Sequence, residues 1–388
     1  MTEVLPEVAW TQREDLRALV EALGPGNARY VGGAVRDTLL DLEVKDIDMA
    51  TVLRPDVVIE RLDAAGIRSV PTGIAHGTVT AVLPGGPVEV TTLRHDVTTD
   101  GRHATVAFAE DWREDAARRD FTINALYADP DTREVHDWFG GLADLAARRV
   151  RFIGDPEQRI REDHLRILRY FRFQARFGSE PADEASEQAC ETLSATLKGL
   201  SRERVGMETL NLLGLPDPAP TVQRMAELGV LVVILPEADP IGLVKLVTEE
   251  RRQCVAPDAI RRLAALLPAD PTLAERVAAR FRLSGAQKKR LVLAARREGV
   301  SADARPLAYR LGREAAFDRL LLQGQEIAPL KGWEVPDLPL RGGEIVERGV
   351  ASGPDVARVL RSVEDRWIAE GFPDRARVEE LLGEVLAR

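Results

Sequence analysis

The chain has 388 residues, 45% of them apolar and 30% charged, which is enough to bury a core in each of roughly two to four domains. A formal net charge of −10 argues against a protein that coats nucleic acid indiscriminately, but it leaves room for an enzyme that concentrates positive charge at one site. Two cysteines exclude a disulfide framework and a cysteine-based zinc site.

The first 140 residues mix helical and strand patterns. The predicted elements, in chain order, are a helix over 11–23, a strand through 30–31, a helix after 32–33, a strand over 46–50, a hairpin of 76–83 and 88–93, and a strand over 122–128. From about residue 141 the periodicity becomes helical throughout, with a proline- and glycine-containing linker over 327–343. The sequence therefore predicts an α+β protein, with an N-terminal α/β head followed by an all-helical remainder.

A glycine turn precedes two alternating acidic residues in the head. Residues i and i+2 of a strand point to the same face, so Asp46 and Asp48 present their carboxylates side by side. Two such oxygen ligands suit Mg²⁺, which takes its remaining ligands from water and phosphates. Gly32 and Gly33 allow the backbone to approach a triphosphate, and Arg36 can pair with a phosphate. Either motif alone is commonplace, but their order and spacing together favour a nucleotide site.

The glycines match neither of two common nucleotide-binding motifs, and this excludes some kinds of nucleotide site. They form neither a Walker A loop nor a G-x-G-x-x-G fingerprint, which disfavours P-loop ATP hydrolysis and NAD binding. A third carboxylate, Glu89, lies in V-E-V on a neighbouring predicted strand. It either completes a two-metal site or simply faces outward, and the sequence leaves both interpretations open.

A second charged cluster runs directly into a buried-looking strand, which is unusual because desolvation of charge is costly. Here Arg119 can meet a phosphate, Asp120 can accept a ribose hydroxyl, and Asn124 can support the site. The alternative is that Asp115, Asp120 and the neighbouring arginines pair with one another.

A third cluster lies on a strongly helical segment, 156–177, whose apolar stripe is Ile160, Ile167, Leu168 and Phe171. Asp163 and Arg166 are three residues apart and are expected to be neighbours on that helix. A carboxylate accepts from an exocyclic amine and a guanidinium donates to ring acceptors, so this pair can read the Watson–Crick edge of cytosine or adenine. Arg169 and Arg172 continue the series towards a phosphate or a base. Alone, such a ladder is more typical of a salt-bridged helix face.

These motifs, in this order, closely resemble the class II tRNA nucleotidyltransferase family, which also contains bacterial poly(A) polymerases. The resemblance covers about residues 28–178 and rests on GGAVRD, DID, VEVTTLR, RRDFTINAL and DPEQRIREDHLRILRYFRF. It implies that Asp46 and Asp48 bind Mg²⁺. It also implies that the incoming CTP or ATP is bound by residues that include Gly33, Arg36, Arg119, Asp163, Arg166, Arg169 and Arg172. The implied organisation is a nucleotidyltransferase head over 1–140, a neck with base recognition over 141–205, a body over 206–326 and an RNA-binding tail over 327–388.

The stretch 94–103 resembles the flexible loop with which the family switches from CTP to ATP. Its charged members are Arg94, Asp96, Asp100 and Arg102, and it departs from the family at Ala104, where proline is expected. Enzymes of the family that add only CC look as if they lack this loop. Its presence therefore favours an enzyme that adds the complete CCA, or one that adds only A.

The predicted function is template-independent addition of CMP and AMP to the 3′ end of tRNA, with Mg²⁺ as cofactor and pyrophosphate as leaving group. The partners are CTP, ATP and the 3′ end and acceptor arm of tRNA; no protein partner is evident. A poly(A) polymerase, an A-only enzyme or, in another class, a non-catalytic helical RNA-binding protein are the alternatives. No apolar run of about 18 residues and no basic-then-apolar N-terminal segment occurs, which predicts a cytoplasmic protein with no membrane partner.

Overall fold

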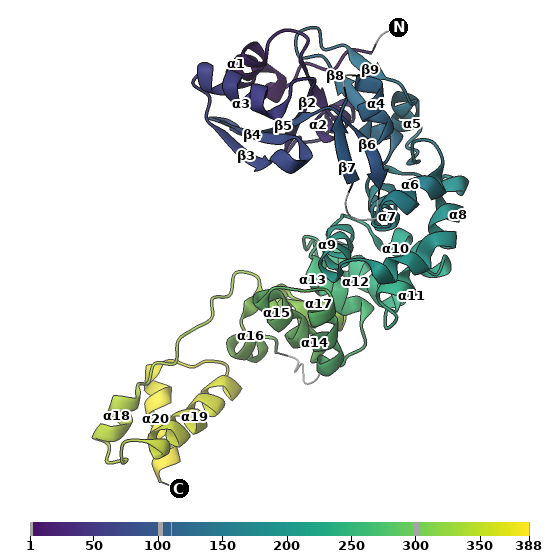
Figure 1. Ribbon diagram of the computed structural model, residues 1–388. Coiled ribbons are helices and arrows are strands. Elements are labelled where there is room, and N and C mark those ends of the chain that lie inside the picture. Colours follow the sequence, from purple (N-terminus) through teal and green to yellow (C-terminus); the bar gives the residue numbers. More distant parts are fainter. Residues whose placement is uncertain (1–2, 100–103, 110, 298–302, 388) are drawn as a thin grey trace. The chain divides into compact units, whose positions relative to one another are not determined.

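The computed structural model describes residues 3–99, 104–109, 111–297 and 303–387 (Figure 1). The chain divides into two compact units, Met1–Pro236 and Glu237–Arg388. The first contains a mixed sheet and helices and the second contains helices, so the predicted α+β class is confirmed. Within the described residues, no helix combines the length and apolarity needed to cross a membrane.

The head is built on a seven-stranded sheet with the order β3-β4-β5-β2-β1-β8-β9. Its strands are β1 Ala28–Val31, β2 Ile47–Thr51, β3 Ser69–Gly73, β4 Thr78–Leu83, β5 Gly86–Thr92, β8 Leu126–Ala128 and β9 Val135–Asp137. Strands β2 and β5 are parallel, and the other neighbours are antiparallel. The predicted hairpin is confirmed as β4 and β5. The strand predicted from residue 122 is wrong in its first part, because Thr122–Asn124 form a 3-10 turn before β8 begins.

Short helices surround this sheet. They are η1 Ala9–Gln12, α1 Glu14–Leu23, α2 Gly33–Leu39, α3 Pro55–Ala64, η2 Ile74–His76, α4 Trp112–Ala117, η3 Thr122–Asn124 and α5 Gly141–Ala146. Helix α1 buries Leu16, Leu19, Val20 and Leu23, the apolar series that predicted it, and packs with α3 against β4. A separate ribbon of β6 Arg94–Thr99 and β7 Ala104–Phe108 occupies the stretch expected to be a loop.

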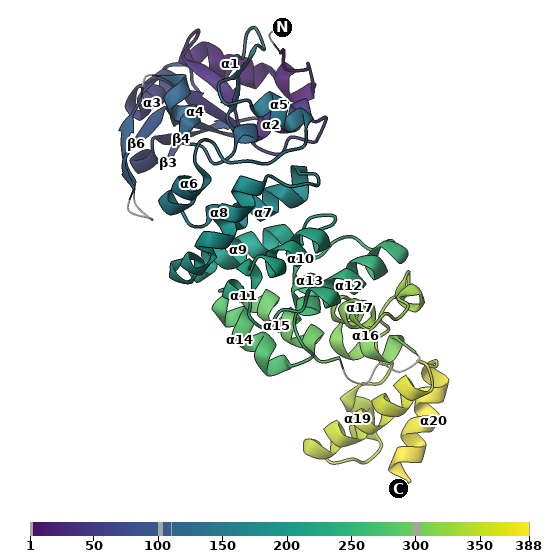
Figure 2. The same ribbon diagram turned by 90° about the vertical axis from the view of Figure 1, so that its right-hand side faces the viewer.

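The remainder of the first unit is helical. Its elements are α6 Pro156–Glu162, α7 Arg166–Phe177, α8 Glu184–Leu193, η4 Ser194–Gly199, α9 Arg202–Leu213, α10 Ala219–Glu227 and α11 Val230–Ile234 (Figure 2). The predicted apolar stripe is confirmed, since Ile160, Ile167, Leu168 and Phe171 are all buried.

The prediction of one continuous helix over 156–177 is wrong. Asp163 is extended, with φ −150° and ψ 105°, and separates α6 from α7. Its side chain accepts a hydrogen bond from the backbone N–H of Leu165 at 3.1 Å. Such a local bond offers the backbone an alternative to the helical ladder, which explains the break.

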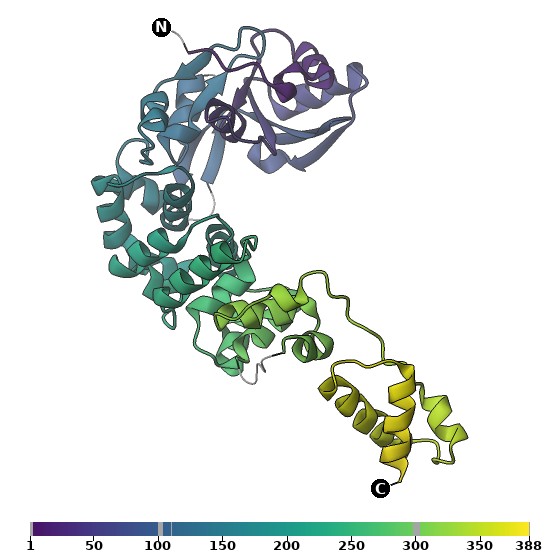
Figure 3. The same ribbon diagram turned by 180° about the vertical axis from the view of Figure 1, so that it is seen from behind.

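The second unit contains two packed groups of helices. The first comprises α12 Pro240–Arg252, α13 Ala259–Leu266, α14 Pro271–Arg280, α15 Gly285–Ala295, α16 Arg305–Leu311, α17 Arg313–Leu322 and η5 Ala328–Leu330. The second comprises α18 Gly342–Glu347, α19 Pro354–Ala369 and α20 Arg375–Leu386, which surround a core of their own (Figure 3). Gly312 separates α16 from α17 at φ 86°, a conformation that disfavours other residues.

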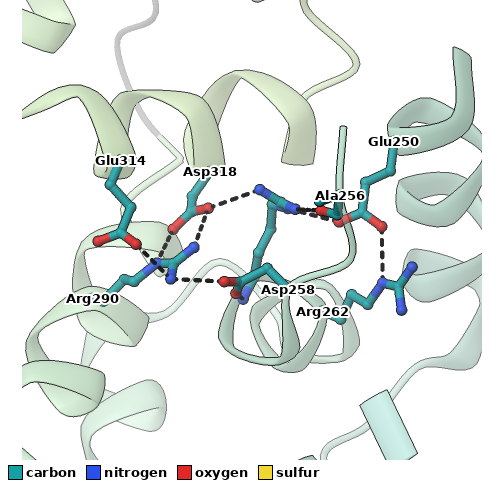
Figure 4. A network of polar contacts seen from close by, with 8 residues as sticks. Glu250, Ala256, Asp258, Arg262, Arg290, Glu314 and Asp318 are labelled. Carbon is teal, nitrogen blue, oxygen red and sulfur yellow. Dashed lines mark hydrogen bonds and ion pairs between the residues drawn. The ribbon is translucent and has the colours of Figure 1, made fainter. Parts of the chain in front are cut away.

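A buried ion network joins four helices of this unit (Figure 4). Glu250 on α12 accepts from Arg261 and Arg262 on α13, at 2.7 and 2.8 Å. Asp318 on α17 accepts two hydrogen bonds from Arg290 on α15, at 2.7 and 2.9 Å. The two carboxylates are at most 1% exposed, so the network is part of the core.

Candidate nucleotide and metal site

The acidic pair lies on one face of the central sheet. Strand β2 begins at Ile47, so Asp46 precedes the strand by one residue and Asp48 lies within it. Ile47 and Met49 are buried, whereas Asp46 is exposed and Asp48 is half-buried. This alternation directs both carboxylates away from the core, in agreement with the period of two that predicted it.

Glu89 lies beside Asp48 on the neighbouring parallel strand. The two residues are register partners in the β2–β5 pair, so their side chains emerge on the same face. Burial and the neighbouring carboxylates of Glu89 and Asp46 raise the pKa of Asp48, although Arg119 lowers it. A divalent cation would relieve this concentration of negative charge, so the donor set fits one.

These carboxylates do not make a complete metal site by themselves. Across the part of the chain that the structure describes, no three His, Cys, Asp or Glu side chains are grouped so as to hold a metal ion. Two carboxylates with water and substrate phosphates as the remaining ligands is the arrangement typical of Mg²⁺.

The glycine turn is fixed by its own geometry and by Arg119. Gly32 has φ 68°, and a Cβ atom there would lie 3.2 Å from Nη1 of Arg119 and 3.6 Å from the carbonyl oxygen of Asn124. A side chain would therefore be both strained and crowded. Gly33 begins α2, and its φ lies in a region that other residues also adopt.

Arg119 is held by Tyr127 and Asp115. Its Nε donates to the Tyr127 hydroxyl at 2.9 Å, and its Nη2 lies 3.5 Å from Asp115. Burial lowers the pKa of Arg119, but Tyr127 and Asp115 outweigh this and raise it, so the guanidinium stays charged. Arg118 also pairs with Asp115, at 2.8 Å. The alternative of pairing within the cluster is thus realised at Asp115, while Nη1 of Arg119 faces the glycine turn.

A chain of polar contacts links the head to α7. The buried Arg36 donates to Asn124 at 2.5 Å and to Asp37 at 2.7 Å. Asn124 donates to Asp120 at 2.9 Å, and Arg169 donates two hydrogen bonds to the other carboxylate oxygen of Asp120, at 2.6 and 2.8 Å. The structure thus brings together four residues that the sequence placed in one site.

Arg172 reaches a partner that sequence reasoning missed. Its Nε donates to Glu208 on α9 at 2.6 Å, and Arg169 lies 3.8 Å from the same carboxylate. Glu208 is 3% exposed, which is rare for a glutamate unless it is paired. The contact joins residues 36 apart in sequence, so no local pattern could have revealed it.

The side chains of Asp163 and Arg166 are held by separate partners, not by each other. Asp163 accepts from Arg204 on α9 at 2.6 Å. Arg166, the first residue of α7, donates to Glu162 at 2.6 Å and to the carbonyl of Arg159 at 2.8 Å. The two residues do not share one helix, because the helix breaks at Asp163, but they remain neighbours: the backbone N–H of Arg166 donates to the carbonyl of Asp163 at 2.9 Å. Arg204 and Glu162 are further members that the sequence did not single out.

The predicted switch loop is only partly described. Arg94 begins β6, where its backbone N–H donates to Asp115 at 3.2 Å and its guanidinium donates to the carbonyl of His76 at 2.7 Å. Asp96 lies in β6, and Asp100 and Arg102 lie outside the described residues. Residues 94–99 of the stretch therefore form a strand that pairs with β7.

Comparison with known proteins gives matches along almost the whole chain. Residues 28–151 match the family described as the Poly A polymerase head domain, and residues 182–241 match a probable RNA and SrmB-binding site of polymerase A. The mitochondrial CCA tRNA nucleotidyltransferase 1 of Mus musculus is 33% identical over 405 residues, covering 97% of this chain and 91% of that protein. The CCA-adding enzyme of Leuconostoc citreum is 41% identical over 188 residues, covering 48% and 45%.

A solved structure extends the likeness to the fold. The CCA-adding enzyme of Bacillus stearothermophilus, crystallised in complex with CTP, superposes with a TM-score of 0.76 at 26% identity, covering 97% of this chain and 98% of that one. Nucleotidyltransferases of this family use a divalent metal, which agrees with the acidic pair on β2. The chain therefore belongs to the class II family of CCA-adding tRNA nucleotidyltransferases and poly(A) polymerases.

Proposed function

We propose that this enzyme adds CMP and AMP from CTP and ATP to the 3′ end of tRNA, building or repairing the CCA terminus and releasing pyrophosphate. The observation that carries the proposal is the juxtaposition of Asp48 and Glu89 on one open sheet face with Arg119 beside them. Relatives that are named CCA-adding enzymes support the choice of reaction within the family.

Asp46 and Asp48 would hold the metal, which we propose to be Mg²⁺, and Glu89 is placed to approach it from β5. When bound, Mg²⁺ lowers the pKa of the attacking RNA 3′-hydroxyl and neutralises charge on the phosphates of the nucleotide. Because Met49 and Ile47 anchor β2 in the core, the two aspartates are held on a rigid element.

The arginines of the head have different tasks in this proposal. Arg119 directs Nη1 towards the glycine turn and is proposed to bind the triphosphate. Arg36 is 5% exposed and already donates to Asp37 and Asn124. Its contribution would therefore be to orient Asn124 and, through it, Asp120.

Base selection is assigned to Asp163 and Arg166. The carboxylate would accept from the exocyclic amine that cytosine and adenine share, and the guanidinium would donate to the ring acceptor. Arg204 and Glu162 orient the two side chains separately, since each holds one of them. Arg169 and Arg172 would lie beside the nucleotide, and Asp120 and Glu208 fix their guanidinium planes. The role of residues 94–103 as a CTP-to-ATP switch stays a prediction.

The decisive assay uses three tRNA transcripts: one lacking the CCA end, one ending after CC, and one complete. Each is incubated with all four nucleoside triphosphates, one of them labelled at a time, and Mg²⁺, and again after chelation of the metal. We expect two CMP and one AMP on the first, one AMP on the second and none on the third. Repeated AMP addition would identify a poly(A) polymerase, and addition to CC-ended tRNA alone an A-adding enzyme. No incorporation with any metal would favour a non-catalytic RNA-binding protein.

The cytoplasmic localisation also stays a prediction. The relative from Mus musculus is named as a mitochondrial protein.

A further inference from the structure

A cavity of about 590 Å³ opens in the second unit, and its lining includes none of the residues assigned above. It is lined by the first turns of α12, the segment after α13, the second residue after α15 and the end of α17. These helices pack on one another (Figure 2). The volume is within the range of roughly 300–1,000 Å³ that small-molecule sites occupy.

Arg297 brings to this cavity a guanidinium whose hydrogen bonds are incomplete. Its Nη2 donates to the carbonyls of Ala264 and Leu267, the latter at 2.9 Å. Its Nε is fully buried and has no acceptor within the described chain. Burial lowers the pKa of Arg297. A buried donor without an acceptor costs free energy, and the positive charge of this guanidinium would attract an anionic ligand to the cavity that Arg297 lines.

Lys245, on α12, is the second cation that lines the cavity, and it is exposed. The two acidic residues of the lining are already engaged. Glu237 accepts from Arg280 at 2.7 Å, and Asp239 caps α12 by accepting from the N–H of Ile241 at 3.0 Å. Lys245 and Arg297 are the lining residues that carry positive charge.

We propose that this cavity binds a phosphate-bearing ligand through Lys245 and Arg297. The guanidinium and the ammonium group both attract a phosphate, the lysine as a point charge. The walls contributed by Leu246, Leu267 and Leu321 would pack against an apolar portion the size of a nucleoside. The phosphate belongs either to a free mononucleotide or to the RNA backbone. The site lies in a different unit from the nucleotidyl-transfer site and goes beyond the proposed function.

The test counts AMP-binding sites and measures RNA affinity in the full chain. Equilibrium dialysis with labelled AMP is made on the unmodified protein, Lys245→Glu, Arg297→Gln and the control Lys289→Glu, which changes an exposed lysine on α15 outside the cavity. Binding of a tRNA that lacks CCA is measured on the same four proteins as a function of salt. Arg297→Gln also removes the bonds to Ala264 and Leu267, so its thermal unfolding is checked. Should it not fold, Lys245→Glu alone decides.

A free mononucleotide ligand would give one more AMP site in the unmodified protein and the control than in Lys245→Glu. An RNA ligand would instead give an equal number of AMP sites throughout, a several-fold loss of tRNA affinity in Lys245→Glu, and a salt slope lower by about one. Either result supports the site and identifies the source of the phosphate. Unchanged AMP stoichiometry and unchanged tRNA affinity in the cavity variants would overturn it. The incorporation assay does not enter this test, so the two proposals can fail independently.

Discussion

Two arginine–carboxylate networks in this chain have the same chemistry and opposite surroundings. One lies in the second unit and is called the body network here: its carboxylates Glu250 and Asp318 are at most 1% exposed, and their arginine partners Arg261 and Arg262 are also buried. The other lies in the first unit and is called the neck network: the side chain of Arg169 is 33% exposed and that of Asp163 is 30% exposed, although both are paired.

The two networks differ in whether arginine N–H groups remain available to a ligand. Both oxygens of Asp318 are taken by Arg290, and Arg261 lies 3.5 Å from one of them, so this carboxylate is fully engaged within the core (Figure 4). The neck network runs from the buried Arg36 through Asn124 and Asp120 to an arginine that reaches solvent. A buried carboxylate whose oxygens are all paired serves to hold helices together. A network that ends on exposed guanidinium groups can also bind an anion.

The largest expected effect separates activity from stability in the head. Asp48→Ala should reduce nucleotide incorporation by at least about 10³-fold, because loss of a metal ligand costs several kcal/mol of transition-state stabilisation. The fold should not suffer. A raised pKa means that the ionised Asp48 is less favourable in the folded chain than in the unfolded one, so removing it relieves repulsion at neutral pH.

The measurement is single-turnover CMP addition together with thermal unfolding. Asp56→Ala, which removes an exposed carboxylate from the first turn of α3, is the matched control and should keep both properties. Near-normal turnover of Asp48→Ala with Mg²⁺ would remove this residue from the reaction.

The body network should respond in the opposite way. Asp318→Ala leaves Arg290 and Arg261 without their shared carboxylate and should cost about 3–5 kcal/mol of unfolding free energy. Glu314 also pairs with Arg290, but its side chain is 70% exposed, so Glu314→Ala should cost about 0–1 kcal/mol. Urea unfolding followed by far-UV circular dichroism compares the two. Equal losses in both variants would mean that burial does not set the strength of this network.

Local patterns were enough to predict the acidic pair and the packing of the neck helices. Alternation on a strand depends on neighbours two residues apart, and the apolar stripe of α6 and α7 depends on neighbours within two turns. The prediction of a continuous helix was wrong at Asp163. The surrounding residues all follow the helical periodicity, but one hydrogen bond from the backbone to the Asp163 side chain replaces the helical backbone bonding there.

The partners that hold the site were beyond local patterns. Arg204 and Glu208 lie 41 and 36 residues from Asp163 and Arg172, on a helix whose contact with α7 depends on tertiary packing. Glu250 and Asp318 belong to no sequence motif, and their burial results from tertiary packing, which the sequence did not predict. Nor could the sequence decide whether Asp115 or a ligand would hold Arg119.

A smaller effect is expected on nucleotide choice in the neck. Asp163→Ala removes the acceptor for the exocyclic amine, and a good base contact is worth about 1–3 kcal/mol of discrimination. Misincorporation of UTP should therefore rise by roughly one to two orders of magnitude. Arg204→Ala leaves the carboxylate in place but unheld, and should relax selection less.

kcat/KM for all four nucleoside triphosphates on one tRNA primer measures this choice. The control is Glu157→Ala, which breaks an exposed pair with Arg161 on α6 and should leave selection unchanged. If Asp163→Ala keeps the ratio of kcat/KM for CTP to that for UTP, the residue serves only in the ion pair with Arg204. The neck network would then be purely structural, like the body network.

The smallest effect is expected at the rim of the body network, where Asp258 joins Arg290 at 2.8 Å and caps α13 through the N–H of Arg261. Burial opposes ionisation, but the N–H of Arg261 and the charge of Arg290 outweigh it and lower the pKa of Asp258. A lowered pKa means that the stabilisation is present above the unfolded value of about 3.9 and is lost as the pH falls through the folded value. Asp258→Asn keeps the cap, because asparagine is as good there, and removes only the charge.

Asp258→Asn should therefore lose about 1 kcal/mol of unfolding free energy at pH 7, as expected for a partly exposed pair. This difference from the unmodified protein should shrink as the pH falls below about 4, because the aspartate then becomes neutral as well. Asp270→Asn changes an aspartate that caps α14 through the N–H groups of Thr272 and Leu273, and serves as control. A difference that persists undiminished in acid would mean that Asp258 acts through the geometry of its cap and that its charge contributes nothing to the network.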